Sequence, residues 1–266
     1  MNKIGFIGCG NLGKTMVEGI YHSRLYTADC IYVADPYSKN LSELYNLYNI
    51  QVTQNTMTIL EDLDIVVLAV KPETIDSVMS QIKDALKPDA IVISVAAGVT
   101  LSHLSFKLGE NRKLVRTMPN TPALVGEAMT AVTFNEWVTE DEKEQIIDIF
   151  SCFGKAEIVE EKSLDAVTAL SGSGPAYIYL VIEAMADGGV LEGLERDVAT
   201  KLAAQTVLGA AKMVLDSGMH IGELKDMLST PGGTTIEGLA VLEAKGVRSA
   251  FIEAERKAAE KSRKLL

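Results

Sequence analysis

The stretch Lys3-Ile-Gly-Phe-Ile-Gly-Cys-Gly-Asn-Leu-Gly13 decides the fold of this chain. Residues 3–7 predict a buried strand, the three glycines that follow predict a tight turn, and residues 14–23 predict a helix. Between a strand and a helix, G-x-G-x-x-G lets the backbone approach a pyrophosphate closely, and the helix N-terminus supplies amides that bind it. Glycines at this spacing also make ordinary strand-to-helix turns. The position of the motif in a strand-turn-helix unit favours a dinucleotide site.

The composition excludes several classes of protein. At 266 residues, the chain is long enough for two domains, and 47% apolar with 23% charged residues is typical of a folded protein. A formal charge of −11 argues against a surface for nucleic acid or an anionic membrane, because both need a basic patch. We therefore expect neither partner.

Cysteine and histidine usage predicts no disulfide framework and no metal site. The three cysteines are far apart, and the three histidines lack metal-ligand spacing. No uninterrupted apolar run approaches the roughly 20 residues that span a bilayer. Glycines break the N-terminal apolar segment, which argues against a signal peptide. We expect a cytoplasmic protein.

Apolar runs of strand length alternate with amphipathic segments through the first part of the chain. Further strands are predicted at residues 30–34, 64–70, 90–94, 113–117, 128–134 and 156–159. Helices are predicted at residues 38–48, 74–86, 101–108 and 140–153. Continuous apolar strands alternating with helices indicate a sheet covered on both faces. The prediction is an α/β Rossmann-type domain with a doubly wound, mostly parallel sheet of about eight strands.

Ligands in such sheets lie beyond the carboxyl ends of the strands. Asp35 stands about 20 residues beyond the glycines, at the end of the second strand, where a carboxylate accepts bonds from ribose hydroxyls and repels a 2′-phosphate. It therefore favours NAD over NADP. Asp35-Pro36 is equally consistent with a helix-entry turn, and both roles can hold together. Asn120 either contacts the ligand or belongs to a rigid loop between two prolines.

The pattern changes near residue 160, after which only helical segments are predicted. Residues 175–191 and 196–216 are apolar around most of the helix, and such helices need burial on more than one side. We predict a dinucleotide-binding domain at 1–160 and an all-helical domain at 161–266 that forms a homodimer and binds the substrate.

Two later loops resemble the opening turn, because each is expected to place free backbone amides at the start of a helix. Residues 170–177 and 228–237 each place glycines directly before a helix start. The pair Gly232-Gly233 would expose successive amides where the helix dipole is positive, which suits a small carboxylate. In the alternative interpretation, Thr234 and Glu237 form a capping box, so that Thr234 only caps a helix.

Seven blocks together resemble the pyrroline-5-carboxylate reductase family over nearly the whole length. They are Phe6-Ile-Gly-Cys-Gly-Asn-Leu-Gly13, Ala69-Val-Lys-Pro72, Ala96-Ala-Gly-Val-Thr100, Arg116-Thr-Met-Pro-Asn-Thr-Pro122, Leu170-Ser-Gly-Ser-Gly-Pro-Ala-Tyr177, Ala186-Asp-Gly-Gly189 and Pro231-Gly-Gly-Thr-Thr-Ile236. The resemblance implies reduction of 1-pyrroline-5-carboxylate to L-proline by NADPH or NADH, the last step of proline biosynthesis. It also implies a site built from both subunits of a homodimer, and it allows larger rings of dimers.

Site residues follow from the resemblance, position by position. Those implied to contact the dinucleotide are Ile7, Gly8, Cys9, Gly10, Asn11, Leu12, Val70, Lys71, Pro72, Val95, Ala96 and Ala97, with Asn55 near the adenine ribose. The loop implied to hold the substrate carboxylate comprises Thr230, Gly232, Gly233 and Thr234. Thr235 would be catalytic, with its hydroxyl at the ring nitrogen. Asp35 replaces the serine that many members have, which leaves NADH and NADPH both open.

Three other functions compete with this interpretation. A reductase acting on a related cyclic imino acid would share every block. A β-hydroxyacid dehydrogenase would need a catalytic lysine about one turn into the helix after Gly174. No lysine follows Gly174 before Lys201, so this base is missing. A non-catalytic nucleotide-binding scaffold would be expected to have a broken 231–235 loop, and this loop is intact.

Overall fold

The computed structural model describes residues 2–264 and divides the chain into two compact units. The first unit runs to Gly172 and takes up the chain again from Ala258, and the second is Ser173–Lys257. Residues 161–172 and the end of the last helix thus pack with the sheet. The predicted boundary after residue 160, which lies where the sequence pattern changes to helices alone, stays a prediction.

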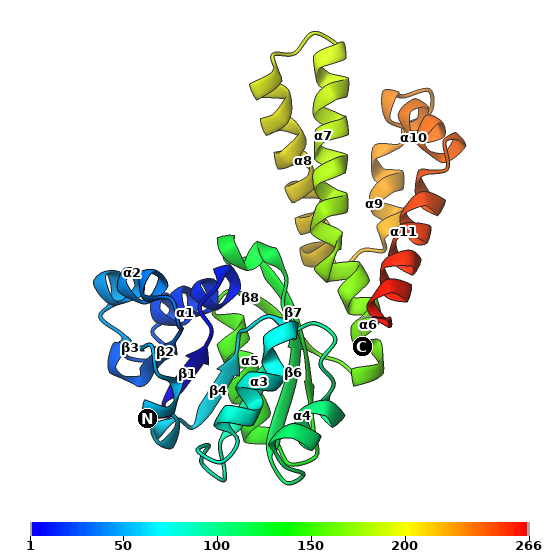
Figure 1. Ribbon diagram of the computed structural model, residues 1–266. Coiled ribbons are helices and arrows are strands. Elements are labelled where there is room, and N and C mark those ends of the chain that lie inside the picture. The colour runs from blue at the N-terminus through cyan, green and yellow to red at the C-terminus, as the bar shows by residue number, and fades with distance from the viewer. Residues whose placement is uncertain (1, 265–266) are drawn as a thin grey trace. The chain divides into compact units, whose positions relative to one another are not determined.

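One eight-stranded sheet, in the order β3-β2-β1-β4-β5-β6-β7-β8, forms the centre of the first unit (Figure 1). Its strands are β1 (Ile4–Ile7), β2 (Ile31–Ala34), β3 (Gln51–Thr53), β4 (Ile65–Leu68), β5 (Ile91–Ser94), β6 (Lys113–Met118), β7 (Ala128–Phe134) and β8 (Gly154–Ile158). Neighbouring strands are parallel except β6 and β7. The predicted Rossmann-type, mostly parallel sheet is confirmed.

Helices cover both faces of this sheet. They are α1 (Asn11–Ser23), α2 (Ser38–Tyr48), α3 (Pro72–Ile82), α4 (Leu101–Leu108) and α5 (Glu140–Ser151). Phe6 and Val67 belong to the same core cluster as residues of α1, α2 and α5, whereas Val66 and Leu68 belong to a second cluster with residues of α3 and α4. Because successive residues of a strand face opposite sides, burial on both faces explains the unbroken apolar runs.

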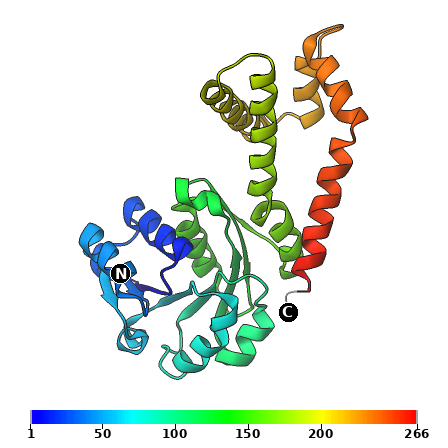
Figure 2. The same ribbon diagram turned by 45° about the horizontal axis from the view of Figure 1, so that its top comes forward.

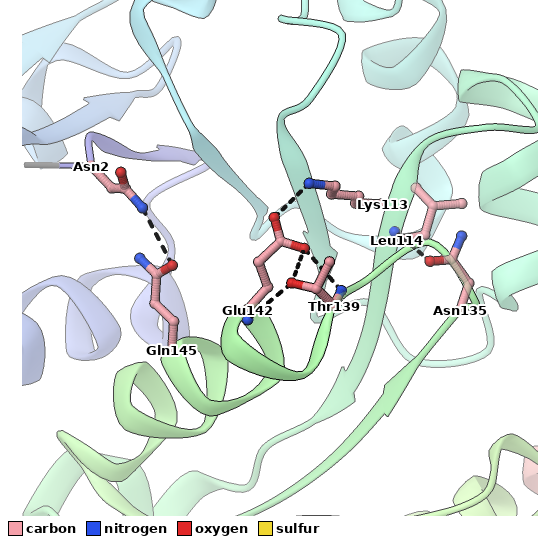
Figure 3. A network of polar contacts seen from close by, with 7 residues as sticks. All are labelled: Asn2, Lys113, Leu114, Asn135, Thr139, Glu142 and Gln145. Atoms are coloured by element: carbon pink, nitrogen blue, oxygen red, sulfur yellow. Dashed lines mark hydrogen bonds and ion pairs between the residues drawn. The ribbon is translucent and has the colours of Figure 1, made fainter.

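The start of α5 is fixed by a capping box (Figure 3). The Thr139 hydroxyl accepts a bond from the Glu142 amide at 3.4 Å, and the Glu142 carboxylate accepts one from the Thr139 amide at 3.0 Å. Lys113, at the start of β6, donates to the same carboxylate at 2.5 Å. Burial raises the pKa of Glu142, but the bonds from Lys113 and Thr139 outweigh it and lower this pKa. The ionised carboxylate therefore stabilises the fold.

Glu142→Gln should lower the free energy of unfolding by about 0.5–1 kcal/mol near neutral pH, because glutamine keeps the cap and loses the ion pair. A lowered folded pKa means that this stability is present above the unfolded pKa of about 4.3 and is lost as pH falls through the folded value. Urea unfolding at neutral and acidic pH measures the difference. Glu140→Gln, at an 85% exposed side chain, is the control. If the free energy of unfolding depended on pH in the same way in both variants, the Glu142 carboxylate would not be the source of this stability.

The second unit is helical throughout (Figure 2). It comprises α7 (Gly174–Leu191), α8 (Arg196–Ser217), α9 (Ile221–Leu228), α10 (Thr234–Ala244) and most of α11 (Val247–Ser262). The contact of α7 with α8 buries only small residues, namely Ala186, Ala199 and Ala203. Leu191 and Leu215 are 86% and 82% exposed. Large apolar side chains thus remain uncovered in a single chain, as an interface would require.

Within residues 2–264, α8 alone is long and apolar enough to cross a membrane, judged by length and composition. Its mean hydropathy is 1.2, and 11% of the window is buried. Lys201 and Lys212 lie within this helix, which is why the sequence shows no uninterrupted apolar run of that length.

Candidate functional site

The loops after β1, β2, β4 and β5 begin side by side at one edge of the sheet. The Gly8 amide donates to the Ala34 carbonyl at 2.8 Å, and the Ala69 amide donates to the Ile7 carbonyl at 2.8 Å. The Val95 amide reaches the Leu68 carbonyl at 3.3 Å. These main-chain bonds continue the parallel ladder past the strand ends. They bring most of the predicted dinucleotide residues to a common rim.

Each glycine of the opening turn has its own structural reason. Gly8 has φ of +96°, and a Cβ there would lie 2.6 Å from the Ala69 carbonyl oxygen. A Cβ on Gly13 would lie 2.7 Å from the Gly8 carbonyl oxygen, so α1 could not approach the strand as closely. At Gly10, by contrast, nothing lies within 4 Å of that position. The first and third glycines therefore shape the turn, and the second leaves its outer face open.

The N-terminus of α1 is open to an anion. Gly10 is the N-cap and supplies no side-chain cap, and the first intrahelical bond runs from the Lys14 amide to the Gly10 carbonyl. The amides of residues 11–13 consequently have no acceptor within the helix. Gly10 and Asn11 are exposed, whereas Leu12 is half-buried. This arrangement fits a pyrophosphate.

Asp35 is turned inward. The residue is 6% exposed, and one carboxylate oxygen accepts a bond from the Cys9 amide at 2.6 Å. The other oxygen accepts a bond from the Tyr37 amide at 2.8 Å, directly before α2. The helix-entry role considered from the sequence is therefore present. The same carboxylate also ties the glycine turn to the end of β2 and leaves a negative charge at the rim.

Cys9 is an inert thiol. It is buried beneath the turn, and burial, followed by the charge of Asp35, raises its pKa to about 11. At neutral pH it is protonated and is no nucleophile. Its backbone amide is bound to Asp35. Any role of Cys9 toward a ligand is thus confined to the shape of the turn.

The other predicted dinucleotide residues lie along the same rim or beside it. Val95 and Ala96 are buried, and Ala97 is half-buried, so mainly their backbone is available to a ligand. Lys71 is the exposed N-cap of α3, which begins at Pro72 directly after Val70. Asn55 follows β3, and its side chain accepts a bond from the Met57 amide at 3.2 Å.

A cavity of about 310 Å³ lies beside the start of α1. Its lining includes Asn11, Leu12, Thr15, Met118, Asn120 and Gly172. Asn11, Leu12 and Asn120 are among the site residues predicted from the sequence, whereas Thr15, Met118 and Gly172 are not. The signal available for Met118 and Gly172 was their place within the blocks 116–122 and 170–177. Nothing in the sequence marks Thr15, whose hydroxyl bonds the Asn11 carbonyl at 2.9 Å.

The substrate loop predicted at residues 230–235 lies in the second unit, at the start of α10. Thr234 is the first helical residue, and the N-cap is Gly233, without a side-chain cap. The alternative capping box of Thr234 with Glu237 is therefore wrong, because a residue inside the helix cannot be its N-cap. The amides of Thr234 and Thr235 have no acceptor within the helix.

This loop is narrow and glycine-dependent. Gly232 has φ of +67°, and the Gly233 amide donates to the Thr230 carbonyl at 3.0 Å. A Cβ on Gly233 would lie 2.3 Å from the Thr230 hydroxyl oxygen. Thr235 is exposed, and its hydroxyl has no protein partner within residues 2–264. The loop thus presents backbone amides and the hydroxyls of Thr230, Thr234 and Thr235 to solvent, and Thr235 is the one that the resemblance places at the ring nitrogen.

Comparisons with known proteins identify both parts of the chain. The family described as "Pyrroline-5-carboxylate reductase dimerisation" matches residues 161–265, and "NADP oxidoreductase coenzyme F420-dependent" matches residues 3–98. Pyrroline-5-carboxylate reductase of Escherichia coli strain K12 is 48% identical over 263 residues, covering 99% of this chain and 98% of that one. The Arabidopsis thaliana enzyme of the same name is 40% identical, with 99% and 95% covered.

Solved structures agree with these sequence relatives. A pyrroline-5-carboxylate reductase from Coxiella burnetii has a TM-score of 0.95 at 36% identity, covering 99% of this chain and 98% of that one. The Plasmodium falciparum pyrroline carboxylate reductase, determined with NADP bound, has a TM-score of 0.88 at 34% identity, with 98% and 97% covered. Fold, motifs and full-length identity lead to one conclusion: the chain belongs to the pyrroline-5-carboxylate reductase family.

Proposed function

We propose that this protein reduces 1-pyrroline-5-carboxylate to L-proline with NADH or NADPH, the last step of proline biosynthesis. The observation that carries the proposal is identity of 48% to the Escherichia coli enzyme over 99% of the chain. Incubation with the imine and a reduced dinucleotide tests it: loss of dinucleotide fluorescence with formation of L-proline is the expected result. Binding without turnover would instead support a nucleotide-binding scaffold.

The open face of Gly10 and the uncapped amides of α1 support binding of the dinucleotide pyrophosphate there. When bound, the dinucleotide supplies hydride from its nicotinamide ring. The 310 Å³ cavity adjoins Asn11 and Leu12, and we assign it to the nicotinamide end. Its lining residues carry no ionisable side chain, so they exclude water and position the ring rather than transfer protons.

The loop at 230–235 is assigned to the substrate. Amides at the start of α10 bind the substrate carboxylate, because the helix dipole is positive there and no cationic side chain is needed. The free Thr235 hydroxyl meets the ring nitrogen and orients it as the imine becomes an amine. A cyclic imine protonates readily near neutral pH, so neither histidine nor metal is required.

The assembly and the location complete the proposal. Residues 1–160 hold the dinucleotide, and residues 161–266 form a homodimer and bind the substrate, in keeping with the dimerisation family matched at 161–265. Exposed leucines of α7 and α8 provide the apolar surface for the dimer. Light scattering of the purified protein gives the number of dimers in the assembly. A cytoplasmic location agrees with free cysteines at 9, 30 and 152.

We further propose that NADH is preferred, because the Asp35 carboxylate, although turned inward, places a negative charge at the end of β2, where a Rossmann domain holds the adenine ribose. Asp35→Ser should raise the NADPH/NADH ratio of kcat/KM about tenfold, a change of about 1.4 kcal/mol. The substitution also removes the bond from the Cys9 amide, and this loss should weaken the binding of NADH and NADPH equally. The ratio of the two kcat/KM values therefore reports on the charge of Asp35 alone. Asp141→Ser, which removes an exposed carboxylate from α5, is the control. An unchanged ratio in Asp35→Ser would remove Asp35 from cofactor selection.

A further inference from the structure

We propose that Asn120, which lines the nicotinamide cavity, is a positioning residue that joins two of the cavity's walls and acts on the dinucleotide through them. Its side-chain amide nitrogen donates to the Ser171 carbonyl at 3.0 Å, and its side-chain oxygen accepts a bond from the Met129 amide at 2.9 Å. One planar group thus connects the loop after β6, the start of β7 and a turn 51 residues further along the chain.

The Ser171 carbonyl lies in an unusual turn and has no donor four residues further on, because residue 175 is a proline without an N–H. Residues 168–172 form a π-helical turn between α6 (Leu164–Val167) and α7. Such widened turns interrupt the regular helical ladder and displace carbonyls from it. A partly buried carbonyl without a partner costs free energy, and the Asn120 amide supplies this partner for Ser171.

The two joined segments are also in tight contact. Met118 and Gly172 both line the cavity, and a Cβ on Gly172 would lie 3.0 Å from the Met118 methyl carbon. A side chain at residue 172 would therefore have to displace the Met118 methyl group from its place in the cavity wall. Breaking the Asn120 bond would let the π turn separate from the loop and displace the surface against which the nicotinamide binds. This consequence depends on the assignment of the cavity made under the proposed function.

At position 120, the side chain has to donate one hydrogen bond and accept another while it stays uncharged, and an amide does both. Asparagine offers a donor to Ser171 and an acceptor to Met129, whereas an ionised aspartate offers acceptors to both and would repel the Ser171 carbonyl. A protonated aspartic acid regains the donor and restores both bonds. The loop after β6, η4 (Thr121–Val125) and the π turn contribute no ionisable residue to the cavity, and exposed Glu127 is the charged neighbour before β7. An introduced carboxyl at 120 would thus titrate by itself.

The experiment compares Asn120→Asp with the wild type in NADH binding and in steady-state kinetics from acidic to alkaline pH. The expected result is that Kd and KM for NADH rise about tenfold at alkaline pH and return toward wild type in acid, while kcat changes little. Gly172→Ala, which displaces the Met118 methyl group without touching Asn120, should raise the same constants at every pH. It also keeps the proposal testable if Asn120→Asp folds only in acid.

Asn135 provides a matched control, because it makes the same pair of bonds elsewhere in the sheet, and Figure 3 shows the one to Leu114. Its oxygen accepts a bond from the Leu114 amide at 3.0 Å, and its nitrogen donates to the Arg112 carbonyl at 2.7 Å. Leu114 precedes Met118 by four residues of β6, about 13 Å along a strand. Asn135→Asp should lower stability without changing NADH affinity.

Three outcomes would overturn the proposal: wild-type NADH affinity in Asn120→Asp at alkaline pH, a loss that does not reverse in acid, or an equal loss in Asn135→Asp. NADH binding is measured without substrate. A failure of imine reduction in the wild type would therefore count against the proposed function and leave the assignment of Asn120 to be decided by binding alone.

Discussion

Gly10→Ala should weaken NADH binding about 100-fold, or by about 2.7 kcal/mol, with almost no change in the free energy of unfolding. The residue has φ of −71° and ψ of −173°, a conformation that alanine adopts readily, and its Cβ would meet no protein atom within 4 Å. The methyl group would instead stand on the face where the pyrophosphate has to approach the amides of α1. It would therefore keep the phosphates too far away for hydrogen bonds.

Gly8→Ala separates this effect from damage to the fold. At that position φ is +96° and the Cβ would lie 2.6 Å from a backbone oxygen, so alanine should lower both stability and NADH affinity. Fluorescence titration with NADH and urea unfolding, performed on both variants, give the two quantities. Wild-type affinity in Gly10→Ala would mean that the N-terminus of α1 is not the phosphate site.

The fold was predictable because its central strands are buried on both faces. Each such strand is a short apolar run in the sequence, so the predicted ends of β1, β4 and β5 lie within a few residues of the observed ends. The predicted bounds of α2 and β7 match the structure. The three-residue strand β3 was missed, since Gln51-Val-Thr53 lies at the sheet edge and has no apolar run.

Helix starts were less predictable, because a turn can wind into a helix without apolar residues. The prediction began the first helix at Lys14, but α1 begins at Asn11, within the glycine motif itself. The predicted start at Thr74 is likewise late, because α3 uses Pro72 as its first residue. In both cases the helix N-terminus lies closer to the rim than predicted, and this position exposes its amides to the site.

The direction of a side chain was the least predictable feature. The sequence located Asp35 at the end of β2, but the bond to the Cys9 amide joins residues 26 apart in the chain. The cavity likewise unites residues 11–15 with residues 118–124 and Gly172. Such partners follow from how the strands are ordered in the sheet, and no local pattern specifies them.

The threonine at the start of α10 should control the rate of the chemical step. Thr235→Val is expected to lower kcat for 1-pyrroline-5-carboxylate about 100-fold, within the range found for a positioned proton-handling group. Valine preserves the shape of threonine, and the hydroxyl that it removes bonds nothing else in the described chain. Stability and NADH affinity should therefore stay close to wild type. Steady-state kinetics, NADH titration and urea unfolding measure the three quantities separately.

Thr235→Ser tests whether the hydroxyl itself is responsible. Serine retains the donor and loses only the methyl group, so its kcat should lie much closer to wild type than that of the valine variant. If both variants turned over like the wild type, the hydroxyl would have no part in the reaction, and the α10 amides would remain as the contribution of this loop. If both were equally slow, the methyl group would matter through packing against the substrate ring. A kcat of Thr235→Ser far above that of Thr235→Val is the result that supports a bond between the Thr235 hydroxyl and the ring nitrogen. Serine can make this hydrogen bond and valine cannot.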